Sequence, residues 1–183
     1  AYSGGQCVGT ILGGTYPRDP NSRLISPQMQ LPEVAAGEEI ILRFQQWWAY
    51  GGADKGAVQI STFEQASDGW SDWVTLDVVE LNTPVWHHAR VDLTAYAGQQ
   101  IRVGFYHQDN EERIGWNENW GWYIDDVELL KQAVPAFEGF EDFELGWGNW
   151  WCDRGLWELG APTAGPDSAY SGGQCVGCLL YTS

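Results

Sequence analysis

Hydrophobic and polar residues alternate along most of the chain with the period of two that is typical of β-strands. Helical periodicity is nearly absent, apart from one turn expected near residues 92–97. Clusters of Gly, Asp and Asn separate the alternating segments and predict turns. The pattern predicts six strands, at residues 38–50, 56–63, 73–81, 86–94, 99–108 and 121–130. Short strands at this spacing favour an all-β fold, an antiparallel two-sheet jelly-roll sandwich.

A nine-residue sequence, AYSGGQCVG, occurs at residues 1–9 and again at residues 169–177. Such a repeat is typical of a tandem array, and we expect the chain to hold one unit in shifted order. The segment LLKQAVPAFEGF interrupts the strand series and predicts a boundary. We therefore expect residues 1–136 to form a jelly-roll body that lacks its opening strands. Residues 137–177 would be the opening segment of the next repeat, either folded back onto this body or donated to another.

Residues 178–183, CLLYTS, replace the sequence that follows the first copy of the repeat. This tail matches one translated frame of a common sequencing adapter, so we interpret it as a sequencing scar. The alternative is a genuine, divergent C-terminus.

Composition narrows the range of partners. The formal net charge is −16, from 25 acidic residues against 9 Lys and Arg, which disfavours nucleic acid and anionic membranes as partners. The chain is 44% hydrophobic and contains 12 Trp, so it is not an acidic disordered tail. No apolar run is long enough to span a bilayer, so we expect no membrane insertion.

Several segments together resemble a known family. They are DFELGWGNW (142–150), LWELGAPTAGPDSAYSG (156–172), SRLISPQMQLP (22–32), LRFQQWW (42–48), VDLTAYAGQQIRVGFY (91–106) and WGWYIDDVEL (120–129). In the order of the expected repeat, they are similar to the MAM-like jelly-roll modules of secreted bacterial proteins. These modules include cleaved-adhesin domains and the C-terminal modules of immune inhibitor A-type metalloproteases. The resemblance implies an extracellular, non-catalytic module that often binds calcium and serves adhesion, glycan contact or assembly.

The adjacent carboxylates of Asp125 and Asp126 interrupt an otherwise alternating strand. Two such charges repel each other unless a cation or hydrogen-bond donors neutralise them. The resemblance implies that Asp126 and Glu144 share a Ca²⁺ ion, with Asp125 and Asp54 as weaker candidate ligands. The alternative is that Asp125 and Asp126 cap a bulge by accepting hydrogen bonds from backbone amides.

The cysteine count predicts a disulfide. Cys7 and Cys175 occupy the same position of the repeat, and Cys178 lies in the suspected scar. One natural unit would then contain two cysteines, so we expect Cys152 to pair with Cys175 or with Cys7. The C-x-x-C spacing at residues 175–178 is weak evidence for redox chemistry, because the first copy has Thr10 in place of the second Cys.

Paired tryptophans are the candidate binding residues. Neighbours in a strand point to opposite faces, so each pair, Trp47–Trp48 and Trp150–Trp151, should place one ring in the core and one outside. An exposed indole indicates a sugar-stacking platform or a subunit interface, unless a loop of the same domain covers it. Trp120 has the same alternatives, as do its neighbours Trp116 and Trp122.

The remaining motifs do not indicate a specific function. The three histidines, His87, His88 and His107, form no metal-binding pattern, and we expect them to be strand or surface residues. The pair Glu111–Glu112 could serve glycosidase chemistry, but a chain with 25 acids makes this reading uninformative.

These observations predict a non-catalytic structural subunit of an extracellular filament or repetitive surface adhesin. Its partners would be copies of itself, joined head to tail by exchange of strands or segments. The alternative is a glycan-binding module of a secreted hydrolase or adhesin, with a polysaccharide as the partner. A third interpretation is an accessory domain of a secreted metalloprotease.

Overall fold

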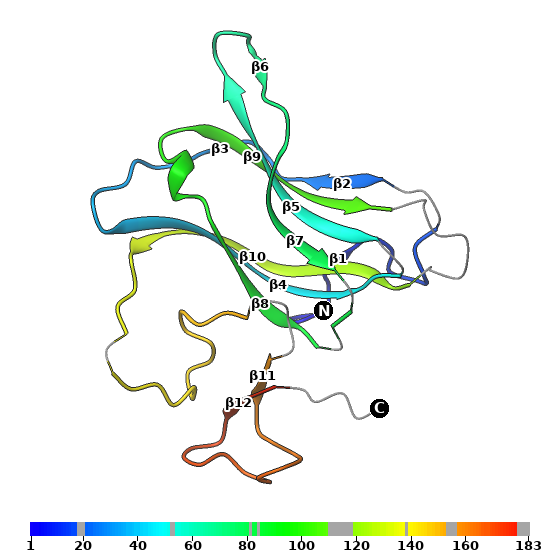
Figure 1. The fold of residues 1–183 in the computed structure, drawn as a ribbon, viewed down its shortest axis with the longest axis vertical. Helices are drawn as coiled ribbons and strands as arrows, with labels where there is room; N and C mark the ends of the chain where they lie inside the picture. Colours follow the sequence, from blue (N-terminus) through cyan, green and yellow to red (C-terminus); the bar gives the residue numbers. More distant parts are fainter. Residues whose placement is uncertain are drawn as a thin grey trace.

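The computed structural model describes residues 1–17, 21–51, 54–80, 82–83, 85–109, 119–137, 139–152 and 157–178. Two antiparallel sheets face each other and enclose the hydrophobic core, as Figure 1 shows. The predicted all-β, two-sheet sandwich is therefore confirmed. No helix in these ranges is long and apolar enough to cross a membrane.

The first sheet has four strands in the order β1-β10-β4-β8. They are β1 (Val8–Gly9), β10 (Gly121–Ala133), β4 (Glu38–Ala49) and β8 (His87–Asp92). The long central pair, β10 and β4, is aligned from Gly121 opposite Ala49 to Ala133 opposite Glu38. Its register shifts once, between Asp125 and Glu128.

The second sheet is built around β5 (Lys55–Glu64) and β9 (Gln100–Gln108), which pair with each other. On the other edge of β9 lie β2 (Ser22–Ile25) and β3 (Met29–Gln30). On the other edge of β5 lie β7 (Val74–Glu80) and β6 (Gly69–Trp70). Every pairing in both sheets is antiparallel.

All six predicted strands are present, and each end that the structure describes lies within three residues of its expected position. The end predicted at residue 81 lies outside the described residues. The expected helical turn is a 3₁₀ turn at Thr94–Tyr96. The short strands β1, β2, β3 and β6 were not predicted, because two to four residues are too few for a period of two to show.

The core lies between the two sheets and is made by alternate residues of the long strands. Aromatic rings link the layers: Phe44 of β4 lies 5.1 Å from Phe105 of β9, and Phe105 lies 5.5 Å from Trp122 of β10. Their T-shaped geometry is the favourable one for aromatic pairs. The fully buried aliphatic side chains around them include Ile40, Ile60, Leu93 and Ile101.

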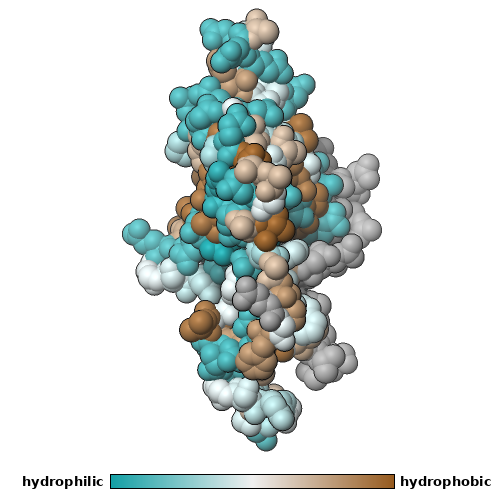
Figure 2. Space-filling model, turned by 90° about the vertical axis from the view of Figure 1, so that its left-hand side faces the viewer, coloured by the Kyte–Doolittle hydropathy of each residue, from teal (hydrophilic) through white to brown (hydrophobic). Residues whose placement is uncertain are grey.

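Residues 134–178, here called the tail, leave the end of β10 and lie beneath the first sheet (Figure 1). Strands β11 (Trp157–Gly160) and β12 (Cys175–Cys178) form a separate antiparallel hairpin that joins neither sheet of the described body. Figure 2 shows this region as a narrower lobe with hydrophobic and hydrophilic residues side by side on its surface. The described residues of the tail therefore add no strand to the body of their own chain.

Candidate functional site

The outer face of the first sheet carries the candidate site. Alternation along β4 directs Trp48 into the core, where it is 3% exposed and donates its indole N–H to the Glu80 carbonyl oxygen at 2.9 Å. The preceding residue, Trp47, therefore faces outward. The expected division of this pair between the two faces is confirmed.

An open groove of about 350 Å³ lies on this face and is lined by four aromatic side chains. Trp47 and Tyr123 are opposite each other on β4 and β10, with ring centroids 5.5 Å apart. Trp86 and Trp120 complete the lining, and Trp120 is 52% exposed. The groove thus presents apolar ring surface to solvent.

The first copy of the repeat supports one wall of this groove. The Tyr123 ring lies over Gly9, where a Cβ atom would come within 2.8 Å of it, so only glycine fits there without displacement. The Tyr123 hydroxyl donates to the Ile11 carbonyl oxygen at 2.8 Å, and burial raises the pKa of this phenol. Tyr2 lies 6.2 Å from Trp86, measured between ring centroids. The groove is therefore held in shape by contacts beyond its own strands.

Polar groups continue along β4 beside the groove. Gln45 lies two residues before Trp47, on the same face, and its amide nitrogen is 3.1 Å from His88 Nδ1. Burial, together with the nearby Arg43, lowers the pKa of His88 and favours its neutral form. Gln45 Oε1 and Arg43 Nε are buried without a hydrogen-bond partner.

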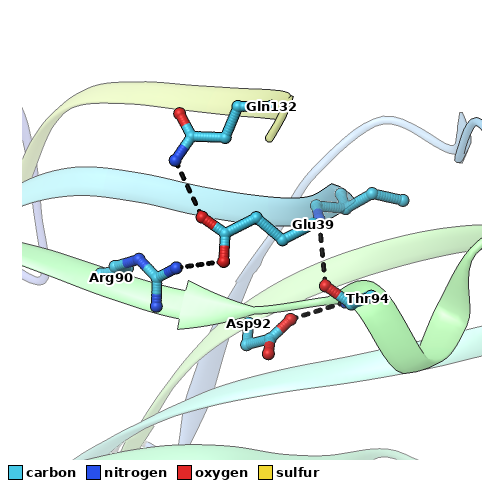
Figure 3. Close-up of polar contacts among 6 residues, drawn as sticks. Glu39, Arg90, Asp92, Thr94 and Gln132 are labelled. Atoms are coloured by element: carbon cyan, nitrogen blue, oxygen red, sulfur yellow. Dashed lines mark hydrogen bonds and ion pairs between the residues drawn. The ribbon is translucent and has the colours of Figure 1, made fainter. Parts of the chain in front are cut away.

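A second group of polar residues lies farther along the same face (Figure 3). The Glu39 carboxylate, whose residue is 7% exposed, accepts from Arg90 at 2.5 Å and from Gln132 at 2.8 Å. Next to it, Thr94 Oγ1 accepts from the Ile40 amide at 3.0 Å. Because both oxygens of Glu39 have donors, this group fits a structural role.

The same arginine connects the body to the tail. The Arg90 guanidinium carbon lies 4.8 Å from the centre of the Trp151 ring, which is a cation–π distance. Arg43, directly opposite Arg90 in the sheet, donates to the Gly148 carbonyl oxygen at 3.5 Å and pairs with Glu128 at 2.7 Å. The tail thus rests on the outer face of the first sheet.

Asp125 and Asp126 lie at the register shift of β10, where Asp125 accepts from backbone amides and Asp126 accepts from a hydroxyl. Asp125 accepts from the amides of Tyr2 at 2.8 Å, Ser3 at 3.3 Å and Asp126 at 2.9 Å. Desolvation opposes its charge, but these donors outweigh that effect and lower the pKa of Asp125. Asp126 has a positive φ of 47° and accepts from the Ser3 hydroxyl at 2.7 Å. The contacts of Asp125 are those expected for the alternative to a metal site, in which these carboxylates cap a bulge.

Two other predicted calcium ligands, Glu144 and Asp54, have hydrogen-bond partners in different parts of the molecule. Glu144 accepts from the amides of Gly173 and Gln174 at 2.9 and 2.8 Å, and Asp54 is buried and accepts from the Tyr16 hydroxyl at 2.6 Å. Within the described ranges, no three His, Cys, Asp or Glu side chains lie close enough to hold a metal ion. The predicted ligands thus have separate hydrogen-bond partners in the structure, and the calcium site stays a prediction.

The predicted disulfide is not formed in the structure. Cys7, Cys152 and Cys175 are free thiols. Cys152 lies 3.8 Å from the carbonyl oxygen of Trp157, whereas Cys175 pairs with Gly160 at the other end of the hairpin. Burial raises the pKa of the Cys152 thiol to about 11, so the thiol stays protonated and slow to oxidise at neutral pH.

The remaining candidates differ from expectation in part. Trp150 and Trp151 lie outside any strand and are 45% and 50% exposed, so the expected division between core and surface is wrong for this pair. The physical reason is that side chains alternate between two faces only in extended strands. His87 and His107 are buried in strands, and His88 lies on the outer face. Trp116, Glu111 and Glu112 lie outside the described residues.

Sequence reasoning missed two of the four groove residues. Tyr123 follows the core residue Trp122, so the alternation that placed Trp47 outside also indicated an outward Tyr123. Trp86 immediately precedes β8, and no pattern in the sequence showed which way its ring would point.

Comparison with known proteins gives one informative relative. A stretch of 135 residues is 32% identical to part of bacillopeptidase F of Bacillus subtilis (strain 168). The match covers 73% of this chain and only 9% of that protein. No family model matches the chain. The chain is thus similar to a small part of a much longer peptidase.

Proposed function

We propose that this chain is a non-catalytic, carbohydrate-binding module of a secreted multidomain protein, with the aromatic groove as its binding site. The observation that carries this proposal is the open groove lined by Trp47, Trp86, Trp120 and Tyr123. Flat aromatic rings offer large apolar contact area to the C–H faces of sugar rings, and a few polar atoms nearby fix orientation.

Two further observations support the proposal. The four groove residues include no nucleophile paired with a base, which fits binding rather than catalysis. The similarity to a stretch that makes up 9% of bacillopeptidase F fits a module attached to a secreted hydrolase. We also propose the assignment to MAM-like jelly-roll modules and an extracellular location, on the sequence resemblance.

The net charge narrows the ligand class. At −16, the chain repels polyanions, so a neutral or cationic polysaccharide is the better ligand. The second candidate function is a structural subunit that joins copies of itself. The observation in its favour is the duplicated nine-residue sequence, because the two copies have different partners in the structure.

The test is a titration of the purified chain with soluble neutral and cationic polysaccharides, such as a β-glucan and partly deacetylated chitin oligomers. Tryptophan fluorescence should change saturably with at least one of them. Trp120→Ala should abolish this change, because Trp120 is the exposed wall of the groove.

The matched control is Trp150→Ala, which removes an equally large exposed indole that packs on Phe137 and Phe143, outside the groove. This variant should bind as the parent does. An absence of saturable change with every polysaccharide, or the same loss in both variants, would contradict the groove as the site.

A further inference from the structure

The two copies of the nine-residue sequence share two local features. Gly4 and Gly172, at the same position of the repeat, both have a positive φ, of 56° and 66°. Each is followed by a short strand at the same position, β1 in the first copy and β12 in the second. The sequence therefore encodes one structural element that occurs twice.

The first copy contacts the body. The amides of Tyr2 and Ser3 donate to Asp125, and the Ser3 hydroxyl donates to Asp126. Val8 lies opposite Ile124 of β10.

The second copy contacts the tail instead. The amides of Gly173 and Gln174 donate to Glu144, and β12 pairs with β11, with Val176 opposite Leu159. The second copy of Tyr2 is Tyr170, which is fully exposed, whereas Tyr2 packs against Trp86.

The two sets of partners are complementary, because each copy uses groups that the other leaves to solvent. Gly5 and Gln6, the equivalents of Gly173 and Gln174, are exposed in the first copy. Thr10 donates its amide N–H to the carbonyl oxygen of Trp122 in β10. Successive residues of a strand direct their backbone groups to opposite edges, so the N–H and C=O of Gly9 point away from β10. In the described body, β1 is the edge strand of its sheet, so that side is open.

The tail carries the apolar surface that such an interface needs. Its large hydrophobic side chains are mostly exposed, including Phe137, Phe140, Leu145, Trp157 and Tyr170. Exposed apolar clusters of this kind mark interaction surfaces in soluble proteins. The tail thus has a donor strand, an anchoring carboxylate and apolar side chains without a core of their own.

We propose that the tail of a second copy of this chain docks on the first copy of the repeat. Strand β11 of the donor pairs with the open edge of β1, which extends the sheet to β11-β1-β10-β4-β8. Glu144 of the donor accepts from the amides of Gly5 and Gln6. This interface goes beyond carbohydrate binding and uses none of the four residues that line the groove.

In the exchange, β1 takes the place on β11 that the identical sequence of β12 holds in the single chain, and β12 is released. The gain comes from burying apolar side chains of the tail. Donor and acceptor surfaces differ, so the contact is heterologous, and repeated contacts generate an open, head-to-tail chain of molecules.

The experiment uses full chains in which the four cysteines are replaced by serine. One chain carries Val8→Cys and the other Leu159→Cys, since the register of Val176 opposite Leu159 places Val8 opposite Leu159 of the donor. When the two are mixed under mild oxidation, the mixed disulfide should form several times faster than in the control mixture. That control combines Leu159→Cys with Val74→Cys, at an equally exposed site in the other sheet.

Equal rates in the two mixtures would overturn the proposal. A second measurement uses the parent chain with its cysteines reduced and no carbohydrate present. Its sedimentation-average mass should rise with concentration, and a constant monomer mass would also overturn the proposal. Gly177→Pro, which weakens the competing β12 pairing, should increase association, and a decrease would count against the exchange.

Discussion

At the scale of single residues, buried histidines set the response of this protein to pH. His87 of β8 is 1% exposed and lies 4.5 Å from the Trp48 ring. Burial is the main cause that lowers the pKa of His87 to about 4. Burial also lowers the pKa of His107, which stacks on Tyr50. These side chains are therefore neutral in the folded state at pH 7.

Stability should fall as the pH drops from about 6.5 toward 4. The unfolded chain binds a proton at His87 below about pH 6.5, while the folded chain resists it down to about pH 4, so acid favours unfolding. The full effect of this one residue is about 3 kcal/mol across that window. Urea unfolding at several pH values should show a shallower pH dependence in His87→Gln than in the parent. The same slope in both proteins would contradict this role.

At the scale of elements, two strand glycines differ in the space that surrounds their Cα atoms. A Cβ atom at Gly56 of β5 would lie 2.6 Å from the Trp122 ring and 2.7 Å from Val79. At Gly69 of β6, the nearest atom would be 3.6 Å away, which is ordinary contact. Strand β5 can therefore cross the core beneath Trp122 only because it has glycine at that point.

Gly56→Ala should destabilise the fold by about 1–3 kcal/mol through overpacking. Gly69→Ala is the matched control and should change stability by less than about 0.5 kcal/mol. The free energy of unfolding from urea titration measures both. If the two variants were equally stable, the close approach at Gly56 would be refuted.

At the scale of the whole molecule, two outer-face arginines hold the tail against the body. Arg90 balances the buried Glu39 and lies over Trp151, whereas Arg43 pairs with the exposed Glu128 and reaches Gly148. The two arginines face each other across β4 and β8, but their carboxylate partners differ in burial: Glu39 is buried and Glu128 is exposed. Only Arg90 should matter for both stability and tail docking.

Arg90→Ala should cost about 3 kcal/mol, because it leaves the carboxylate of Glu39 buried without its cation. Arg43→Ala, which breaks a more exposed pair, should cost less than about 1 kcal/mol. Arg90→Lys keeps the charge but loses the planar stacking on Trp151, so it should loosen the tail with a smaller loss of stability. Urea unfolding gives the stabilities, and hydrogen exchange of residues 139–152 reports on the tail. Comparable losses for both alanine variants would contradict this division.

The amino-acid sequence by itself determined the fold class, the six predicted strands and the outward position of Trp47. These follow from local alternation, which a strand of six or more residues displays whatever surrounds it. Only the tertiary structure decided which rings share one groove, because Trp86 and Trp120 precede their strands and their directions depend on distant neighbours. It also decided that Asp126 and Glu144 contact separate copies of the repeat, and that Cys152 and its two expected partners are free thiols. Spacing along a chain constrains neighbours in sequence, whereas ligand sets and disulfides require residues far apart in sequence to meet in space.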